Sequence, residues 1–336
     1  MNRRDFLRTS ALAGAGLVLS RGGWGQALGQ DFVPSPLEVG TPKCLWGAFA
    51  MPVGQEKPMD ALVALEQLVG RQMAVHRDYQ GMDSNLLSKA AQWMSQRGTI
   101  PYRSFHAWTG RQRYAIQWRN IAAGQHDVWL KQQAADLAAW GRKMYICFHH
   151  EPEDDTTGNP ASQTYNHVGC GNAADFKNAY NHVRNIFSKA TNLVWLVALL
   201  SPTYLGNNGG ANAWVPANLD ILGVDGYNRY PCSGPIYKSF TDKFAPAQAY
   251  AKSKGKPFAI PEWGCIEQTD CNHPSGDPLG KAKWITDAGS VAKSWPNLRF
   301  VIYSHEVDPG PLNFRVDTSS SSLTAFTAVG HDPYFN

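Results

Sequence analysis

Eight short apolar runs, each followed by a stretch of helical character, constrain the fold of this chain most strongly. The runs have the length of β-strands and occupy residues 45–50, 73–79, 100–108, 144–150, 193–200, 221–227, 258–263 and 300–304. Strands that alternate with helices form parallel βαβ units. Eight such units over roughly 300 residues fit a closed barrel better than an open doubly wound sheet. The pattern therefore predicts an α/β fold, a single (β/α)8 TIM barrel.

The segments between these runs predict the helices. Apolar residues spaced three and four apart, or residues that favour helices, occur at 59–69, 85–96, 127–140, 174–189, 245–253, 278–294 and 322–329. The link at 202–219 is rich in Gly and Asn and is only weakly helical. No linker divides the chain, so residues 30–336 are predicted to form one barrel domain.

The first 29 residues have the pattern of an export signal. Arg3 and Arg4 precede a short apolar run at 11–19, and Ala27-Leu28-Gly29 fits the small-x-small preference of a cleavage site after Gly29. A charged start followed by a short apolar stretch is typical of a signal peptide that is removed from the mature protein. The paired arginines resemble a twin-arginine signal, which a receptor reads. We expect residues 1–29 to be a twin-arginine-type signal peptide and the mature protein to be secreted or periplasmic.

The charge balance of the chain argues against two classes of partner. The first 29 residues hold four arginines and one aspartate, so their removal lowers the formal net charge from +4 to +1. A nearly neutral protein lacks the charge footprint of nucleic-acid or anionic-lipid binding. No apolar run approaches the about 20 residues that span a bilayer. We expect no nucleic-acid partner and, after signal removal, no membrane partner.

The cysteines leave the disulfide pattern open. Export would permit disulfides, but the sequence does not select a pairing among the six, Cys44, Cys147, Cys170, Cys232, Cys265 and Cys271. Cys265 and Cys271 are near enough to close a small loop, and Cys147 in its apolar run fits a buried free thiol. The spacing lacks the Cys-x-x-Cys pattern of a structural zinc site. We expect neither a metal nor a cofactor.

Two glutamates follow or end predicted strands, where barrel enzymes place their active sites. Glu151 comes after the fourth run and Glu262 lies near the end of the seventh. Glycoside hydrolysis requires two facing carboxyl groups, one protonated to assist the leaving oxygen and one ionised to attack the anomeric carbon. In retaining enzymes these groups lie about 5–5.5 Å apart. The pair therefore indicates a retaining glycosidase.

Three short motifs, taken together in this order, resemble glycoside hydrolase family 26. They are His150-Glu151, Gly-Val-Asp-Gly-Tyr at 223–227 and Pro-Glu-Trp-Gly at 261–264. The likeness extends by order and spacing of strands from Cys44 to the C-terminus. This family belongs to a clan of retaining barrel glycosidases with glutamates on strands four and seven. Its members are mostly β-mannanases, with some β-glucanases and β-xylanases.

The resemblance implies a role for each matching residue. Glu151 corresponds to the acid/base and His150 to the histidine before it, while Glu262 corresponds to the nucleophile. Asp225 and Tyr227 match an Asp-x-Tyr pair whose tyrosine contacts the nucleophile. Residues two apart on a strand share a face. A hydroxyl of Tyr227 that donates to Glu262 would keep that carboxylate ionised.

Further candidates line the same predicted mouth. Arg77 could pair with a carboxylate, and His106 could bind a sugar hydroxyl, although a structural hydrogen bond is as good an interpretation for both. His76 is expected on the face opposite Arg77. Tryptophans with exposed faces can stack on sugar rings, and Trp263 beside the nucleophile is the strongest such candidate. The other candidate platforms are Trp46, Trp108 and Trp214.

The resemblance predicts a retaining endo-β-glycanase that cleaves β-1,4-mannan by double displacement. It also implies a monomer acting on a polysaccharide or oligosaccharide. Two departures from the family pattern, Pro-Glu-Asp-Asp at 152–155 and Ser-His-Glu at 304–306, fall where sugar subsites would be built. A β-glucanase or β-xylanase therefore stays an alternative. A non-catalytic polysaccharide-binding barrel is another alternative, although such a protein usually lacks one of the two carboxylates.

Other acidic residues leave two alternatives. A metal hydrolase could use the acidic and histidine residues at 149–155, with Glu153 to Asp155 forming a weak Ca²⁺ site. Adjacent residues of a strand point to opposite faces, however, so His149 and His150 should not bind one metal. Alternatively, Glu153, Glu267 or Glu306 could replace a member of the catalytic pair.

Overall fold

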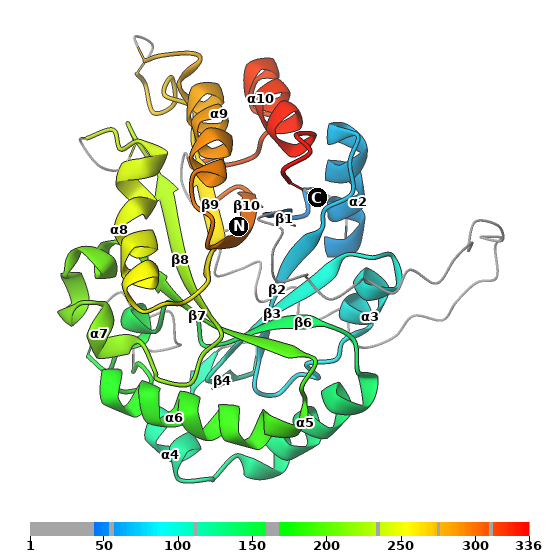
Figure 1. The fold of residues 1–336 in the computed structure, drawn as a ribbon, viewed down its shortest axis with the longest axis vertical. Coiled ribbons are helices and arrows are strands. Elements are labelled where there is room, and N and C mark those ends of the chain that lie inside the picture. The colour runs from blue at the N-terminus through cyan, green and yellow to red at the C-terminus, as the bar shows by residue number, and fades with distance from the viewer. Residues whose placement is uncertain are drawn as a thin grey trace, which may run out of the picture.

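The fold is a closed barrel of parallel strands, as the sequence predicts. The computed structural model describes residues 44–53, 57–110, 113–158, 168–232, 236–273, 276–308 and 312–335. Eight strands follow one another around the barrel in the order β1, β10, β9, β8, β7, β6, β3, β2 (Figure 1). Their bounds are β1 Leu45–Ala50, β2 Val75–Gly81, β3 Ile100–His106, β6 Met144–Phe148, β7 Leu193–Leu200, β8 Ile221–Asn228, β9 Phe258–Cys265 and β10 Leu298–His305. Because β1 pairs with both β10 and β2, the barrel closes.

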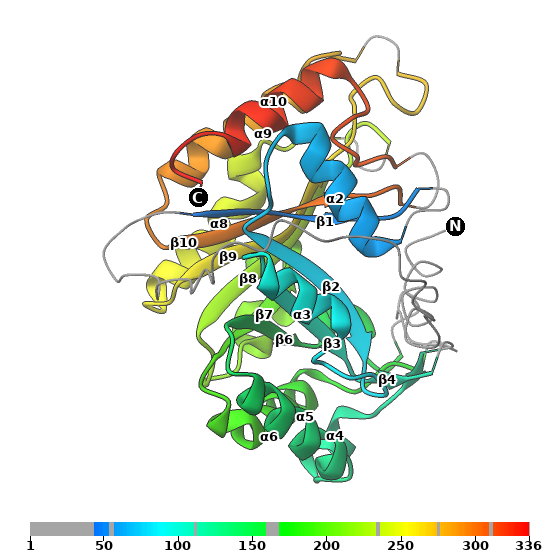
Figure 2. The ribbon, with the colours of Figure 1, turned by 90° about the vertical axis from the view of Figure 1, so that its right-hand side faces the viewer.

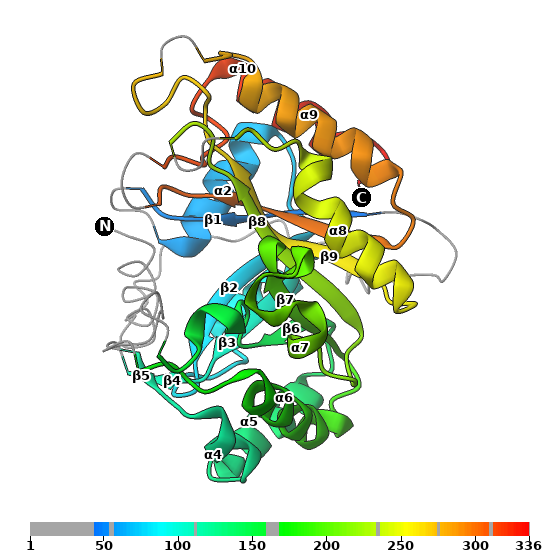
Figure 3. The ribbon, with the colours of Figure 1, turned by 90° about the vertical axis from the view of Figure 1, so that its left-hand side faces the viewer.

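Helices connect the strands and cover the outside of the barrel (Figures 2 and 3). The α-helices are α2 Pro58–Val69, α3 Lys89–Gln96, α4 Trp118–Ala122, α5 Asp127–Trp140, α6 Ala173–Ile186, α7 Ala211–Trp214, α8 Phe240–Ser253, α9 Gly280–Lys293 and α10 Ser320–Gly330. Short 3-10 turns are η2 Pro152–Asp155, η4 Phe187–Lys189, η5 Ser201–Leu205 and η6 Asn207–Gly209. A small hairpin, β4 Trp108–Thr109 and β5 Tyr114–Ala115, extends beyond β3. The weakly helical link at 202–219 thus contains η5, η6 and α7.

Helix starts differ from the sequence prediction where a cap decides the start. Helix α8 begins at Phe240 rather than at Ala245, because Ser239 and Asp242 form a capping box. Pro246 lies inside this helix. Helix α3 begins only at Lys89, because the Ser88 hydroxyl caps it by accepting from the Ala91 N–H.

Two apolar layers hold the barrel. The interior is filled by side chains from alternate strand positions, among them Val75, Tyr102 and Ile302. The larger layer lies between the strands and the helices and includes Trp46 and Leu62. This alternation leaves the polar side chains at the carboxyl ends of the strands in a mouth above the interior layer.

One disulfide joins segments beside this mouth. Cys232, which follows β8, is bonded to Cys271, which follows β9, with their Cα atoms 5.3 Å apart. The interpretation that a disulfide between Cys265 and Cys271 closes a small loop is therefore wrong. Cys265 is a buried free thiol, as is Cys147, for which the prediction is confirmed.

The described part of the chain includes no helix that is long and apolar enough to cross a bilayer. The predicted signal peptide at residues 1–29 lies outside the described residues.

Candidate active site

A bulge in β9 directs Glu262 into the barrel mouth. Ala259 faces the interior layer, and strict alternation would point Glu262 outward. Between the pairs Gly223↔Ala259 and Asp225↔Glu262, however, β9 contains one residue more than β8. The shift falls at Ile260 and Pro261, and proline is a residue type that strands tolerate at bulges. Because of this shift, Glu262 lies opposite Asp225 and points inward.

Three donors hold the Glu262 carboxylate. The Tyr79 hydroxyl donates to Oε1 and the Tyr227 hydroxyl donates to Oε2, both at 2.6 Å. Arg77 Nη1 lies 3.1 Å from Oε1, and both side chains are fully buried. Positive charge and hydrogen bonds to a carboxylate favour its ionised form. The surroundings of Glu262 thus favour the ionised form that a nucleophilic carboxylate requires.

Arg77 supplies the positive charge below this carboxylate. Its Nη1 lies 3.3 Å from Asp225 Oδ2, and its guanidinium lies over the rings of Tyr79 and Tyr102, each 4.9 Å away. Burial alone would lower the pKa of Arg77, but Tyr102, Tyr79, Asp225 and Glu262 together hold it well above its ordinary value. The structure therefore supports the interpretation that Arg77 pairs with carboxylates, here Asp225 and Glu262.

His150 lies beside Glu262 and is held from its other side. Its Nε2 is 3.6 Å from Glu262 Oε1, while its Nδ1 is 2.8 Å from Ser104 Oγ and 2.6 Å from His106 Nε2. Burial, followed by the neighbouring histidines, lowers the pKa of His106 well below its ordinary value, so His106 is neutral at neutral pH. The contact between His106 and His150 is therefore made by a neutral His106 ring.

Glu151 lies beyond the end of its strand, in a left-handed turn. Strand β6 ends at Phe148, and Glu151 has φ 50° and ψ 48° at the start of η2. Its N–H donates to the Ala198 carbonyl of β7 at 2.9 Å. The side chain is largely buried at 4 % exposure, directly after His150, which contacts Glu262. The sequence pattern had placed the strand up to His150.

Of the three alternative carboxylates, Glu306 contacts a residue that donates a hydrogen bond to Glu262. The Tyr227 hydroxyl lies 2.9 Å from Ser304 Oγ and 3.3 Å from Glu306 Oε1. Glu153 instead accepts hydrogen bonds from Leu200 N and Thr203 Oγ1. Glu267 accepts three hydroxyl donors of the segment before and within α10, Thr318, Ser319 and Ser322. These two carboxylates hold neighbouring elements together.

The expected tryptophan platforms need correction. Trp263 is fully buried and faces the helices, with its ring 5.6 Å from the rings of both Trp46 and Trp284. The bulge that turns Glu262 inward turns Trp263 outward. Trp46 and Trp214 also belong to this outer layer, so the prediction that these three stack on sugar is wrong. Trp108 lies at the mouth, but it is 5 % exposed and stacks on His106 at 4.1 Å.

Two groups of side chains in the described residues have the closeness of metal ligands. One combines His150, Asp225 and Glu262, and the other combines His106, His149 and Asp155. His149 and His150 thus fall in different groups, as expected for neighbours that diverge. His76 points away from the mouth, where its Nδ1 lies 2.7 Å from the Ala48 carbonyl oxygen.

Sequence reasoning missed Tyr79 and Ser104. Tyr79 follows Arg77 by two positions on β2, so both face the mouth. The same spacing relates Ser104 to His106 on β3. This spacing was the available signal, because each partner had already been singled out.

Several of the proteins that this chain resembles are named as endoglucanases or mannanases. No protein-family model matches it. Endoglucanase H of Acetivibrio thermocellus is 24 % identical over 294 residues, which cover 83 % of this chain. The chain spans only 30 % of that relative's length.

Similar folds occur among solved mannanase structures. The chain matches the GH26 β-mannanase BoMan26A from Bacteroides ovatus with a TM-score of 0.55 and 14 % identity, over 88 % of this chain and 90 % of that one. The catalytic domain of the GH26 endo-β-1,4-mannanase of Bacillus sp. JAMB-750 gives 0.55 and 15 %, over 88 % and 87 %. A β-mannanase from a symbiotic protist of the termite Reticulitermes speratus, complexed with gluco-manno-oligosaccharide, gives 0.55 and 16 %, over 88 % of both chains. In fold, the chain thus resembles solved β-mannanases of glycoside hydrolase family 26, and in sequence it resembles an endoglucanase.

Proposed function

We propose that this chain is a retaining endo-β-glycanase that hydrolyses a polysaccharide by double displacement. The observation that carries this proposal is the buried Glu262 carboxylate, which accepts hydrogen bonds from Tyr79 and Tyr227 and pairs with Arg77 at the carboxyl end of the barrel. Donors of this kind favour the charged form of a carboxylate, which is the form that attacks in a double displacement.

In the first step, Glu262 attacks the anomeric carbon while Glu151 donates its proton to the leaving oxygen. A covalent glycosyl–enzyme forms, and the shortened polymer leaves. The tyrosine hydroxyls of Tyr79 and Tyr227 hold both carboxylate oxygens, so the attacking group has a fixed orientation.

In the second step, Glu151 acts as the base. It takes a proton from a water molecule, which attacks the same anomeric carbon and releases Glu262. Two inversions leave the product with the configuration of the substrate. His150 directly precedes Glu151 in the sequence, and its contact with Glu262 fits a role in binding the sugar nearest the cleaved bond.

β-1,4-Mannan is the substrate we propose, because the similar solved structures are named as β-mannanases. β-Glucan is the second candidate, because the curated relative is named an endoglucanase. Since Trp46, Trp214 and Trp263 are buried, the sugar subsites of this chain must use other side chains.

A reducing-sugar assay against β-mannan, mixed-linkage β-glucan, β-xylan and a bacterial exopolysaccharide tests the proposal. We expect release of reducing ends from one polymer, loss of at least about a thousandfold in Glu262→Ala, and a smaller loss in Glu151→Ala for aryl glycosides with good leaving groups. Tight binding of a polymer without any hydrolysis would replace the proposal with the polysaccharide-binding barrel. Full activity in Glu262→Ala would reject the assigned nucleophile.

A further inference from the structure

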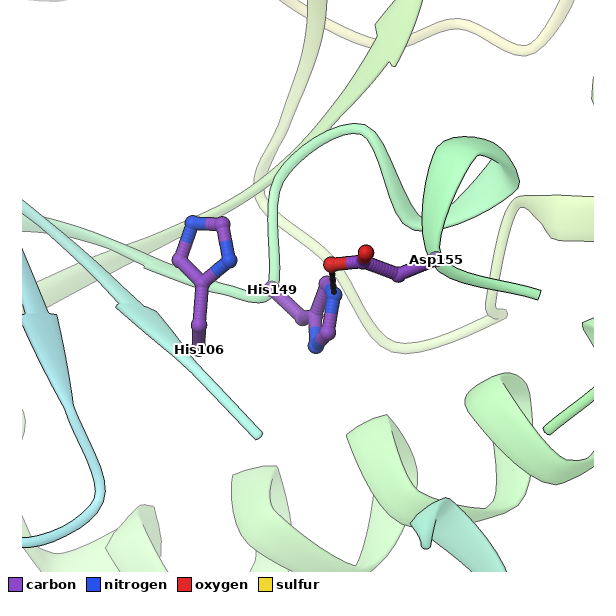
Figure 4. A group of neighbouring side chains, drawn as sticks. All are labelled: His106, His149 and Asp155. Atoms are coloured by element: carbon purple, nitrogen blue, oxygen red, sulfur yellow. Dashed lines mark hydrogen bonds and ion pairs between the residues drawn. The ribbon is translucent and has the colours of Figure 1, made fainter. Parts of the chain in front are cut away.

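A buried cluster next to the proposed acid/base has no role in the mechanism above. Figure 4 shows its three members, His106, His149 and Asp155, with the Asp155 carboxylate directed at the His149 ring. His106 ends β3, His149 follows β6, and Asp155 ends η2. All three are at most 2 % exposed. The cluster is therefore covered by protein in this structure, and two of its members, His149 and Asp155, flank Glu151 in the sequence.

The hydrogen bonds of His149 fix its tautomer and argue against a metal ligand. Its Nδ1 accepts the Ala107 N–H at 3.2 Å and the Trp118 indole N–H at 3.1 Å. Both partners are donors only, so Nδ1 carries no hydrogen and Nε2 carries it. That N–H donates to Asp155 Oδ2 at 2.8 Å. The nitrogen that would have to bind a metal therefore already carries a hydrogen.

These three bonds connect the elements that surround Glu151. Ala107 follows β3, Trp118 begins α4, and Asp155 belongs to η2, the turn that Glu151 starts. The backbone N–H of His149 also donates to the Phe105 carbonyl of β3 at 2.7 Å. A single imidazole thus ties the segment after β6 to three neighbours.

The segment after β6 needs these hydrogen bonds because its backbone adopts an unfavourable conformation. His149 has φ 53° and Glu151 has φ 50°, both in the left-handed region that residues with a Cβ rarely adopt. Such conformations persist where surrounding contacts determine them, and they cluster at active sites. In this chain the left-handed turn at Glu151 sets the direction in which its carboxyl leaves the backbone.

We propose that the His149–Asp155 pair is a positioning device that aims Glu151 at the leaving oxygen. The inference rests on the proposed function, in which Glu151 is the acid/base. Neither member of the pair contacts substrate. Without the pair, Glu151 samples other directions, and proton donation to the leaving group suffers more than attack by Glu262.

Three variants separate positioning from general destabilisation. His149→Asn keeps a side-chain oxygen that can accept from Ala107 and Trp118 and suits a left-handed backbone, but its shorter amide has no N–H at the position from which His149 Nε2 donates to Asp155. Asp155→Ala removes the acceptor. Asp155→Asn is the conservative control, because its amide oxygen can still accept from His149 Nε2.

The measurement is kcat/KM on two substrates, the polysaccharide and a dinitrophenyl β-glycoside of the same sugar. The dinitrophenolate group leaves without a proton, so its kcat/KM does not depend on the acid. We expect His149→Asn and Asp155→Ala to lose at least about tenfold on the polysaccharide and less than about threefold on the aryl glycoside. Asp155→Asn should recover most of the polysaccharide activity. Azide should raise kcat of the two disabled variants on the aryl glycoside, because it attacks without a base.

Two other results would overturn parts of this proposal. Equal losses on both substrates, after correction for the active fraction measured from the dinitrophenolate burst, would overturn the positioning role. Stoichiometric Zn²⁺ binding that His149→Asn abolishes would overturn the tautomer argument. Glu151→Ala measured in parallel separates the two proposals. If the activity loss of Glu151→Ala does not depend on the leaving group, the proposed function fails. If the loss of Glu151→Ala depends on the leaving group but the losses of the His149 and Asp155 variants do not, this inference alone fails.

Discussion

At the scale of single residues, the site is a carboxylate surrounded by donors. Glu262 and Tyr227 were identified from short motifs, and the structure brings their side chains to 2.6 Å. Tyr79 makes an equally short bond. Its spacing of two from Arg77 on β2 predicts that both side chains share a face. The contact of its hydroxyl with Glu262 on β9 depends on how the barrel closes, which the sequence of a single strand does not contain.

Replacing Tyr79 by Phe should impair the nucleophile without disturbing the fold. The lost hydroxyl removes one hydrogen bond that favours the charged carboxylate, so Glu262 should take up a proton at higher pH. We expect kcat/KM to fall about tenfold and the acidic limb of its pH profile to move upward. The matched control is Tyr145→Phe, whose buried hydroxyl has no hydrogen-bond partner in the described part of the chain. An unchanged acidic limb in Tyr79→Phe would contradict the role.

At the scale of elements, strand and helix positions were predictable, while the irregularities that aim the side chains were not. The run at 45–50 and the helix at 127–140 agree with β1 and α5 residue for residue. The β9 bulge and the left-handed residues after β6 break the period-2 alternation on which strand prediction rests. These departures fall at Glu262 and Glu151, where local rules are expected to yield to function.

Glu153 links η2 to β7 and η5, and its environment predicts how stability varies with pH. Burial raises the pKa of Glu153 from 4.5 to about 8. Between these values the folded chain keeps a proton that the unfolded chain has released, so the stabilising contribution is complete below pH 4.5 and is lost as pH rises through 8. Glu153→Gln keeps an oxygen acceptor for Leu200 and Thr203 but has no proton to lose.

The free energy of unfolding of the variant should therefore rise relative to that of wild type as pH increases from 5 to 9, by about a few kcal/mol at most. Thermal unfolding at a series of pH values measures the difference. Asp136→Asn, at a partly exposed carboxylate of α5, is the control. Parallel curves for Glu153→Gln and wild type would show that Glu153 is not a buried acid in solution.

At the scale of the whole molecule, one barrel carries all the proposed chemistry, and its order of strands was predictable because each βαβ unit is local in sequence. The Cys232–Cys271 pairing was not, because it joins two segments 39 residues apart that meet only in the closed barrel. A disulfide is stable in oxidising compartments. It therefore supports our proposal that the protein is exported.

Changing Arg3 and Arg4 to lysines should block export through the twin-arginine route, because the receptor reads the paired arginines. We expect the wild-type full chain to appear outside the cytoplasm with a new N-terminus near Gln30, and the variant to stay inside with its N-terminus intact. Cell fractionation with mass spectrometry measures both. Equal export of the two chains would contradict a twin-arginine signal.

The most direct test of the central claim is the configuration of the product at the moment of cleavage. ¹H NMR during hydrolysis of β-1,4-mannan by the mature protein distinguishes the two anomers of the new reducing end before they interconvert. Double displacement at Glu262 predicts that the β-anomer appears first and that the α-anomer grows in later by mutarotation. Initial release of the α-anomer would show a single displacement by water and would contradict the assignment of Glu262 as a nucleophile.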